Sequence, residues 1–130
     1  MPLFTVTLRA GRSADEIDGL SAAIHAASVA TGYPADDQFQ RFLPCEPGHL
    51  RVDPRYPGLP KARTERALII EVLVSSGTAT ERKQALVKAL VEQLALAGTD
   101  PNDVMVFFLE TDRASGSFGG GQFAPPVVFA

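Results

Sequence analysis

The proline at position 2 is the residue whose chemistry depends most on its place in the chain. We expect Met1 to be removed, because the side chain of Pro2 is small, so that the mature chain begins with a secondary amine. Partial burial and nearby cations disfavour a protonated amine and lower its pKa towards neutrality. A base of that strength can move protons to and from carbon. Many chains begin Met-Pro without consequence, so the proline alone leaves both interpretations open.

Arg12 is the second candidate, just after a segment of alternating polarity. A guanidinium at this place could hold a substrate carboxylate through two parallel hydrogen bonds. The alternative is a solvated arginine beside a helix cap. Pro2 and Arg12 fall at opposite ends of one predicted strand, so a site that used both would need a neighbouring subunit.

The elements that must position these residues follow from hydrophobic periodicity. Ser13 and Glu16 form a capping box, which predicts a helix that ends at Gly32. In chain order the pattern predicts a strand over 3–9, this helix, a strand over 38–43, a strand over 67–74, a helix over 79–97 and a strand over 104–109. The segment 44–64 is too rich in proline for regular structure apart from a short strand near 50–52. Its length suggests that it covers a site or an interface.

The second half of the sequence repeats the first. A shift of 66 positions superposes 3–43 on 69–109 without a gap. Identical residues fall where structure demands them, and the pairs are Val6 with Val72, Gly11 with Gly77, Leu20 with Leu86, Gly32 with Gly98 and Asp37 with Asp103. We therefore predict a single domain over 1–130, with repeat halves at about 2–44 and 67–121 and a crossing at 45–66.

Each half predicts a strand, a helix and a parallel second strand. The fold class is therefore α/β (α+β), with a four-stranded sheet and two helices on one face. The other sheet face has no helix left to cover its apolar residues, so we expect an oligomer. The glycine-rich and then apolar tail from Ser115 onward is expected to reach across a neighbouring subunit.

Composition excludes several classes of function. With 15 acidic and 12 basic residues and no basic run, the chain is not expected to bind nucleic acid. Its longest apolar stretch, 67–74, is far too short for a bilayer, and the sequence shows no leader, so we expect a cytoplasmic protein. Cys45 is the single cysteine, and neither His25 nor His49 has other metal-ligating residues at a suitable spacing in the sequence. No metal and no cofactor are expected.

Pro2 and the duplication together resemble the tautomerase superfamily, over nearly the whole chain. Gly11-Arg12-Ser13 is similar to a tripeptide of 4-oxalocrotonate tautomerase, and Ser117-Phe118-Gly119 to the aromatic-glycine turn near that family's active site. The length, Pro34-Ala35-Asp36-Asp37 and the tail resemble most the malonate semialdehyde decarboxylase branch. The resemblance implies the duplicated β-α-β fold, a catalytic Pro2, a substrate-binding Arg12 and a homotrimer.

The same resemblance implies roles for Asp37 and Phe118. Asp37 matches an acid of the decarboxylase branch that orients water or the substrate carbonyl. Its mirror in the second half, Asp103, favours instead a turn role common to both halves. Phe118 would wall the pocket and keep it apolar, or would pack against an interface.

One departure concerns the substrate anchor. The decarboxylase branch has two arginines just after its third strand, where this chain has Ser76 and Thr78. Arg41, Arg63 or Arg66 could take their place, and we expect Arg66 to contribute to substrate binding.

The sequence thus predicts a cofactor-free tautomerase that acts on a small 2-oxo acid or enol, its partner being a small-molecule carboxylate. The alternatives are an activity like that of malonate semialdehyde decarboxylase or a hydratase, and a non-catalytic oligomeric binding module on the same scaffold.

Overall fold

The computed structural model of the chain describes residues 1–125 and residue 129. The first half contains β1 (Leu3–Arg9), α1 (Ala14–Ala30) and β2 (Phe39–Cys45), and the second half contains β3 (Leu68–Ser75), α2 (Thr80–Leu96) and β4 (Val104–Thr111). A hairpin of β5 (Ser117–Gly119) and β6 (Gln122–Phe123) follows, and single 3-10 turns lie at Pro47–His49, Pro101–Asp103 and Arg113–Ser115.

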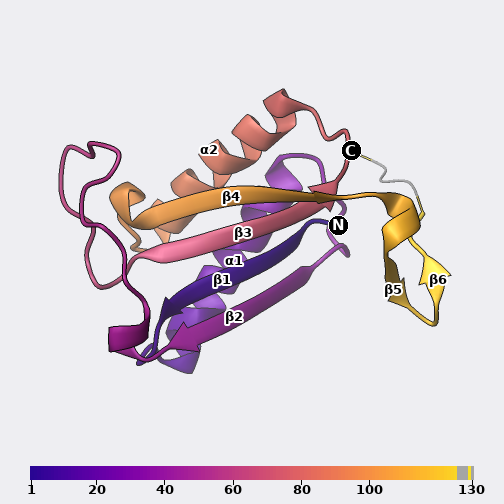
Figure 1. Ribbon diagram of the computed structural model, residues 1–130. Coiled ribbons are helices and arrows are strands. Elements are labelled where there is room, and N and C mark those ends of the chain that lie inside the picture. Colours follow the sequence, from indigo (N-terminus) through magenta and orange to yellow (C-terminus); the bar gives the residue numbers. More distant parts are fainter. Residues whose placement is uncertain (126–128, 130) are drawn as a thin grey trace.

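The main sheet has the strand order β2-β1-β3-β4 (Figure 1). β1 is parallel to β2, and β3 is parallel to β4, as two β-α-β units require. The units meet through antiparallel pairing of β1 with β3. Both helices pack on one face of the sheet, so the predicted fold class is confirmed.

Local sequence explains where the helices begin and end. The capping box of α1 forms as predicted, because the Ser13 side chain accepts from the Glu16 backbone N–H and the Glu16 carboxylate accepts from Ser13. Both helices end just before a glycine in the left-handed region, with φ +99° at Gly32 and φ +97° at Gly98. Glycine adopts this conformation without steric cost, which explains the identical residue in both halves.

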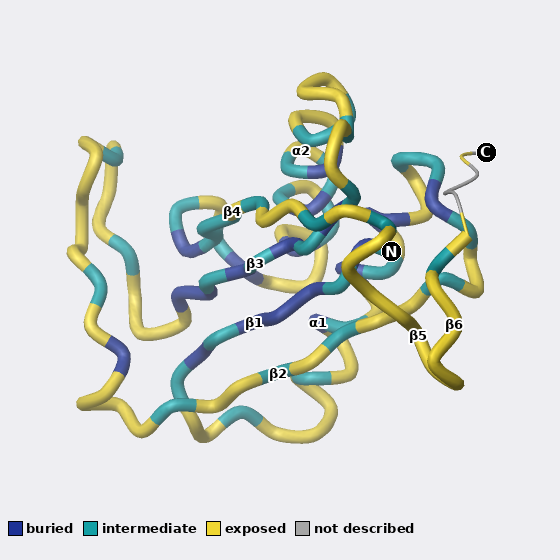
Figure 2. Tube along the Cα trace, turned by 45° about the vertical axis from the view of Figure 1, so that its right-hand side comes forward, coloured by how far each residue is buried: buried dark blue, intermediate teal, exposed yellow. Residues whose placement is uncertain are grey.

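The core lies between the sheet and the helices. Phe4, Val6 and Leu8 of β1 alternate with more exposed neighbours, as do four residues of β3. They pack against buried residues of the two helices, which are Leu20, Ile24, Leu86, Leu90 and Leu94. Figure 2 shows the same division, with the buried segments concentrated on the two central strands.

The opposite face of the sheet, which we call the outer face, is covered by neither helix. Cross-strand register places three rows on it: Phe39, Leu3, Leu73 and Leu109; Arg41, Thr5, Glu71 and Phe107; Leu43, Thr7, Ile69 and Met105. Phe107 is 59% exposed and Leu109 is 50% exposed. The first and third of these rows are apolar or nearly so, which is unusual for a surface in contact with water.

Some predicted elements need correction. β2 runs from Phe39 to Cys45 and β4 from Val104 to Thr111, so both extend past the predicted 38–43 and 104–109. No strand forms near 50–52, because this stretch is held in an irregular loop by contacts of arginine side chains with backbone carbonyls, such as that of Arg51 with Gly48. Among the described residues no helix has the length and hydrophobicity needed to span a membrane.

The tail packs on its own chain as far as it is described. In the β5–β6 hairpin, the ring of Phe118 lies 4.9 Å from that of Phe39 in β2, measured between centroids. Residues 126–128 and 130 of the predicted reaching segment lie outside the described residues. Contact of the tail with a neighbouring subunit stays a prediction.

Candidate active site

The topology gathers three chain segments at one end of the sheet. Because β1 is antiparallel to β3 and β4, its first residue lies beside the last residues of those strands, as Figure 1 shows at the end marked N. The 3-10 turn after β4 and the β5–β6 hairpin lie at the same end. Residues that follow β3 and β4 are therefore available to act on a ligand held near the amino terminus.

The amino terminus makes one direct contact with an acidic side chain. The amine of Met1 donates to Oδ2 of Asp37 at 2.5 Å, and the two side chains are only 10% and 13% exposed. The other oxygen, Oδ1, is buried and has no hydrogen-bond partner among the described residues. Pro2, the next residue along the chain, has a fully buried side chain. A nearly dry ammonium–carboxylate contact is much stronger than one on the open surface.

Met1 lines two cavities. The first, about 350 Å³, lies between the end of the sheet and the β5–β6 hairpin, and the second, about 360 Å³, is lined by the turn after β3 and by Tyr33, which follows α1. Met1, Ser75, Arg113 and Ala124 line both of them. The amino terminus is thus at a wall shared by two cavities.

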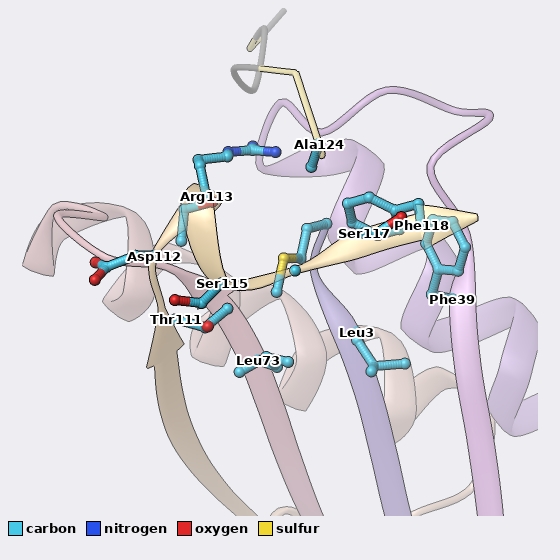
Figure 3. A pocket seen from close by; sticks show the side chains of 13 residues that line it. Leu3, Phe39, Leu73, Thr111, Asp112, Arg113, Ser115, Ser117, Phe118 and Ala124 are labelled. Atoms are coloured by element: carbon cyan, nitrogen blue, oxygen red, sulfur yellow. The ribbon is translucent and has the colours of Figure 1, made fainter. Parts of the chain in front are cut away.

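The first cavity has an apolar side and a polar side. Figure 3 shows Phe39 and Phe118 together at one side, and Thr111, Arg113 and Ser115 at the other. Leu3 and Leu73 of the outer face form its floor between these groups. Phe118 therefore lines a pocket beside the amino terminus, although the exposed fraction of its side chain is still 45%.

Arg113 is the arginine that lines both cavities. It begins the 3-10 turn after β4, and its guanidinium points towards Ala124 (Figure 3). Its Nη2 is buried and has no hydrogen-bond partner among the described residues. A buried guanidinium nitrogen without an acceptor is costly, and a bound carboxylate would supply the missing acceptor.

The second cavity contains the positions of the missing arginines. The cavity is lined, beside Met1, by the turn Ser76, Gly77 and Thr78. This turn has no positively charged side chain. The Thr78 hydroxyl donates to the Ser75 carbonyl at 2.6 Å. The Thr78 hydroxyl proton is therefore already used within the turn.

Aromatic groups close the far side of the second cavity. The rings of Tyr33 and Phe129 meet edge to face at 5.0 Å, and the Arg82 guanidinium lies 3.4 Å from the centroid of Phe129. Burial raises the pKa of the Tyr33 hydroxyl above its ordinary value, and the charge of Arg82 opposes that shift. Tyr33 is thus a neutral wall of this cavity.

Comparisons with known proteins identify the family to which this chain belongs. A family model described as tautomerase enzyme matches residues 37–119. This chain belongs to the tautomerase family. Among curated proteins, no sequence matches it significantly.

Several solved structures resemble nearly the whole chain. FG41 malonate semialdehyde decarboxylase inhibited by 3-bromopropiolate is 30% identical, with a TM-score of 0.85 over 93% of this chain and 92% of its own. A malonate semialdehyde decarboxylase studied as wild type, proline-to-alanine mutant and inactivated enzyme is 31% identical, with a TM-score of 0.85 over 93% of each chain. A native fused 4-OT shares only the fold, at 22% identity and a TM-score of 0.77 over 94% of this chain and 95% of its own. The predicted resemblance to tautomerases and to malonate semialdehyde decarboxylases is confirmed.

The structure does not bring all the predicted site residues of this chain together. Asp37 and Phe118 lie at the amino-terminal end of β1, beside Pro2: Asp37 contacts the Met1 amine, and Phe118 lines the first cavity together with Met1. Arg12 and Arg66 lie at the opposite end, where Nη2 of Arg12 donates to the Arg66 carbonyl at 2.9 Å. The reason is the antiparallel pairing of β1 and β3, which places the residue before β3 beside the residues after β1. A site that joined them to Pro2 would need a second subunit.

The remaining candidates also lie elsewhere. Arg41 bonds to Thr5 on the outer face, and Arg63 donates to the Asp53 carbonyl within the crossing. His25 contacts the Ala35 carbonyl through Nε2, while His49 is exposed in a 3-10 turn. Among the described residues, no three histidine, cysteine or acidic side chains come close enough to hold a metal ion.

Arg113 is the site residue that the sequence analysis did not predict. It carries no motif, and its repeat mate, 66 positions earlier, is Pro47. The usable signal was topological: the first basic residue after β4 must lie at the same end of the sheet as the start of β1, once the two halves are paired antiparallel.

Proposed function

We propose that this tautomerase interconverts the enol and keto forms of a small 2-oxo acid, with the Pro2 nitrogen as the group that carries the proton. The supporting observation is the amino terminus held by Asp37 at the wall between two cavities. The proposal requires that Met1 begins the chain and is removed. Loss of Met1, which lines both cavities, would then make the nitrogen of Pro2 the chain's terminal amine.

The proposed step balances without a cofactor. The neutral secondary amine of Pro2 takes the proton from the enol hydroxyl as the carbonyl forms. The ammonium so formed gives a proton to the neighbouring carbon, where the electron pair of the carbon–carbon double bond forms the new C–H bond. The nitrogen ends as the neutral amine with which it began, and nothing is oxidised or reduced. A positioned acid–base group of this kind accelerates proton transfer by roughly 10²- to 10⁴-fold.

Asp37 has two roles in this proposal. Its Oδ2 holds the amine in place, as it holds the Met1 amine in the full-length chain. The unpartnered Oδ1 can accept from a water that in turn donates to the substrate oxygen. These two observations support the role that the resemblance implies for Asp37.

The cavity suggests the substrate class. We assign Arg113 to the substrate carboxylate, because its buried Nη2 lacks an acceptor at the edge of both cavities. The side formed by Phe39, Phe118 and Leu73 suits an apolar group. A substrate with one carboxylate and one apolar substituent fits better than a small molecule that is polar at both ends.

A decarboxylase or hydratase activity is the second candidate. It is favoured by the 30% and 31% identical neighbours, one of which is described with decarboxylase and hydratase activities. It is disfavoured by Ser76 and Thr78 in place of the arginine pair. A non-catalytic binding module would use the same cavities without turnover.

An assay with two substrates separates these candidates. We expect the mature protein to accelerate ketonisation of phenylenolpyruvate, followed by the loss of enol absorbance, with a higher kcat/KM than it shows for decarboxylation of malonate semialdehyde. The reverse order would support the decarboxylase. Binding of phenylenolpyruvate without turnover of either compound would support the binding module.

We also infer that the outer face is buried in a homotrimer. Two similar structures under 25% identity, both fused 4-OT, are described as trimers, one symmetric and one asymmetric. In this chain Phe107 and Leu109 lie on the exposed outer face together with Phe39 and Leu43. Removing these side chains from water would supply the free energy of association.

Charges placed on the outer face should therefore dissociate the oligomer. By gel filtration with light scattering, the wild type is expected at about three times the 13.8 kDa mass of the chain. The double variant Phe107→Lys/Leu109→Lys is expected as a monomer, because forming the trimer would bury two unpaired charges in each subunit. The control, Leu96→Lys, changes a side chain of α2 that is already 83% exposed and should leave the trimer intact. A monomeric wild type, or a trimeric double variant, would contradict the inference.

A further inference from the structure

A third cavity, which we call the arginine cavity, lies at the other end of β1 from Pro2. Its volume is about 520 Å³, and its lining includes Arg9, Gly11, Arg12, Pro47 and Arg66. In Figure 1 this end of the sheet carries the proline-rich crossing, away from the end marked N. We propose that the arginine cavity is a second ligand site, which binds the carboxylate of a small organic acid without reacting with it.

Unused donors are the first argument. Arg9 donates from Nη2 to the Leu50 carbonyl at 3.2 Å, while its Nη1 is buried without a partner among the described residues. Arg12 uses Nη2 on the Arg66 carbonyl. Guanidinium groups have five N–H donors each, so both arginines retain donors for an anion.

The charge balance of the cavity also favours an anion. Three arginines line it, against one acid, Glu65. A second acid, Glu16, pairs with Arg66 at 2.6 Å. Burial first, and then the charge of Arg66, lower the pKa of the Arg12 guanidinium, and Glu16 opposes this only in part. A bound carboxylate would relieve the remaining positive charge.

The internal repeat supplies an independent argument. Moved by 66 positions, five of the seven residues that line the arginine cavity fall on residues that line the cavity beside Met1, whereas Glu65 and Arg66 have no mates there. The clearest pairs are Arg9 with Ser75, Gly11 with Gly77 and Arg12 with Thr78. Gly11 and Gly77 share a left-handed backbone, with φ +112° and +85°, so the two turns have related shapes.

The two ends of the sheet have therefore kept related cavities with different chemistry. The end beside Pro2 has serine and threonine where the arginine cavity has guanidinium groups. Conversely, Pro47 stands in the arginine cavity where Arg113 stands beside Met1. The residue that mates with Pro2 in the repeat is Leu68, which lies inside the chain and has no free amine. Binding without catalysis follows from that difference.

The test is a titration of the isotope-labelled mature protein with malonate, followed through backbone amide signals. We expect saturable shifts at Gly11 and Arg12. In Arg12→Gln/Arg66→Gln these shifts should need at least about 10-fold more malonate, because hydrogen bonds from charged donors are lost. The control, Lys88→Gln, removes a charge from a side chain that is 80% exposed on α2 and should change nothing.

A second variant keeps the proposal open to failure if the double variant does not fold. Glu65→Gln removes the acid that lines the cavity and should tighten malonate binding by about 2- to 5-fold. The absence of saturable shifts at Gly11 and Arg12, or equal affinities in wild type and both arginine-cavity variants, would overturn the proposal. Shifts at Gly77 and Thr78 report separately on the site beside Pro2, so failure of the proposed function is distinguishable from failure of the arginine cavity.

Discussion

Pro2→Ala is expected to lower kcat for ketonisation of phenylenolpyruvate by roughly 10²- to 10⁴-fold, which is the usual contribution of a positioned acid–base group. Alanine is also small, so removal of Met1 should be unaffected, and the variant replaces a secondary amine by a primary one. The fall should lie in kcat and not in KM, since Arg113 and the apolar wall still bind the substrate.

Packing must be separated from chemistry in this variant, because Pro2 is fully buried. Thermal unfolding of Pro2→Ala and wild type measures the packing cost directly. Pro44→Ala is a matched control, since Pro44 is an exposed proline in β2, and its kcat should equal that of wild type. A folded Pro2→Ala variant with wild-type kcat would rule out the proline mechanism.

Arg113→Ala is expected to lower kcat/KM by roughly 10- to 100-fold, mostly through a higher KM. The reason is that a hydrogen bond to a charged group contributes about 1.5–3 kcal/mol, and this loss affects the bound substrate and the transition state alike. Arg113→Lys should recover only part of the affinity, because an ammonium cannot form the two parallel bonds of a guanidinium.

This substitution also decides between two arginines. Arg51→Ala, at an exposed position in the crossing, is the control and should leave kcat/KM unchanged. If Arg113→Ala retained normal kcat/KM while Arg12→Ala lost it, the substrate anchor would be Arg12 of a neighbouring subunit. That outcome would contradict the assignment of Arg113.

The elements of this tautomerase could be predicted because each one has a local cause. Alternation in β1, the capping box at Ser13 and the glycine after each helix act over a few residues. The repeat added what single elements could not, since two gap-free halves imply two copies of one β-α-β unit. The crossing was predicted less well, because its shape depends on distant contacts such as Arg9 with Leu50.

The site was harder to predict, because it depends on how the two halves meet. Periodicity predicts each half but not the antiparallel pairing of β1 with β3. Without that pairing, Arg66 could be offered as a replacement for the missing arginine pair, but the fold places it beside Arg12, at the other end of β1 from Pro2. Arg113 had no motif to mark it, and only the direction of β4 brings it to the amino terminus.

The most direct test of the account is the mass of the intact purified protein before and after incubation with a small electrophilic alkynoate, such as the 3-bromopropiolate that inhibits the FG41 enzyme. We expect a chain that lacks Met1 and gains a single adduct, which peptide mapping places on the Pro2 nitrogen. Pro2 would then be a reactive amine in a pocket that accepts carboxylates. A chain that keeps Met1, or a mature chain that stays unmodified, would contradict the proposal that Pro2 carries the chemistry.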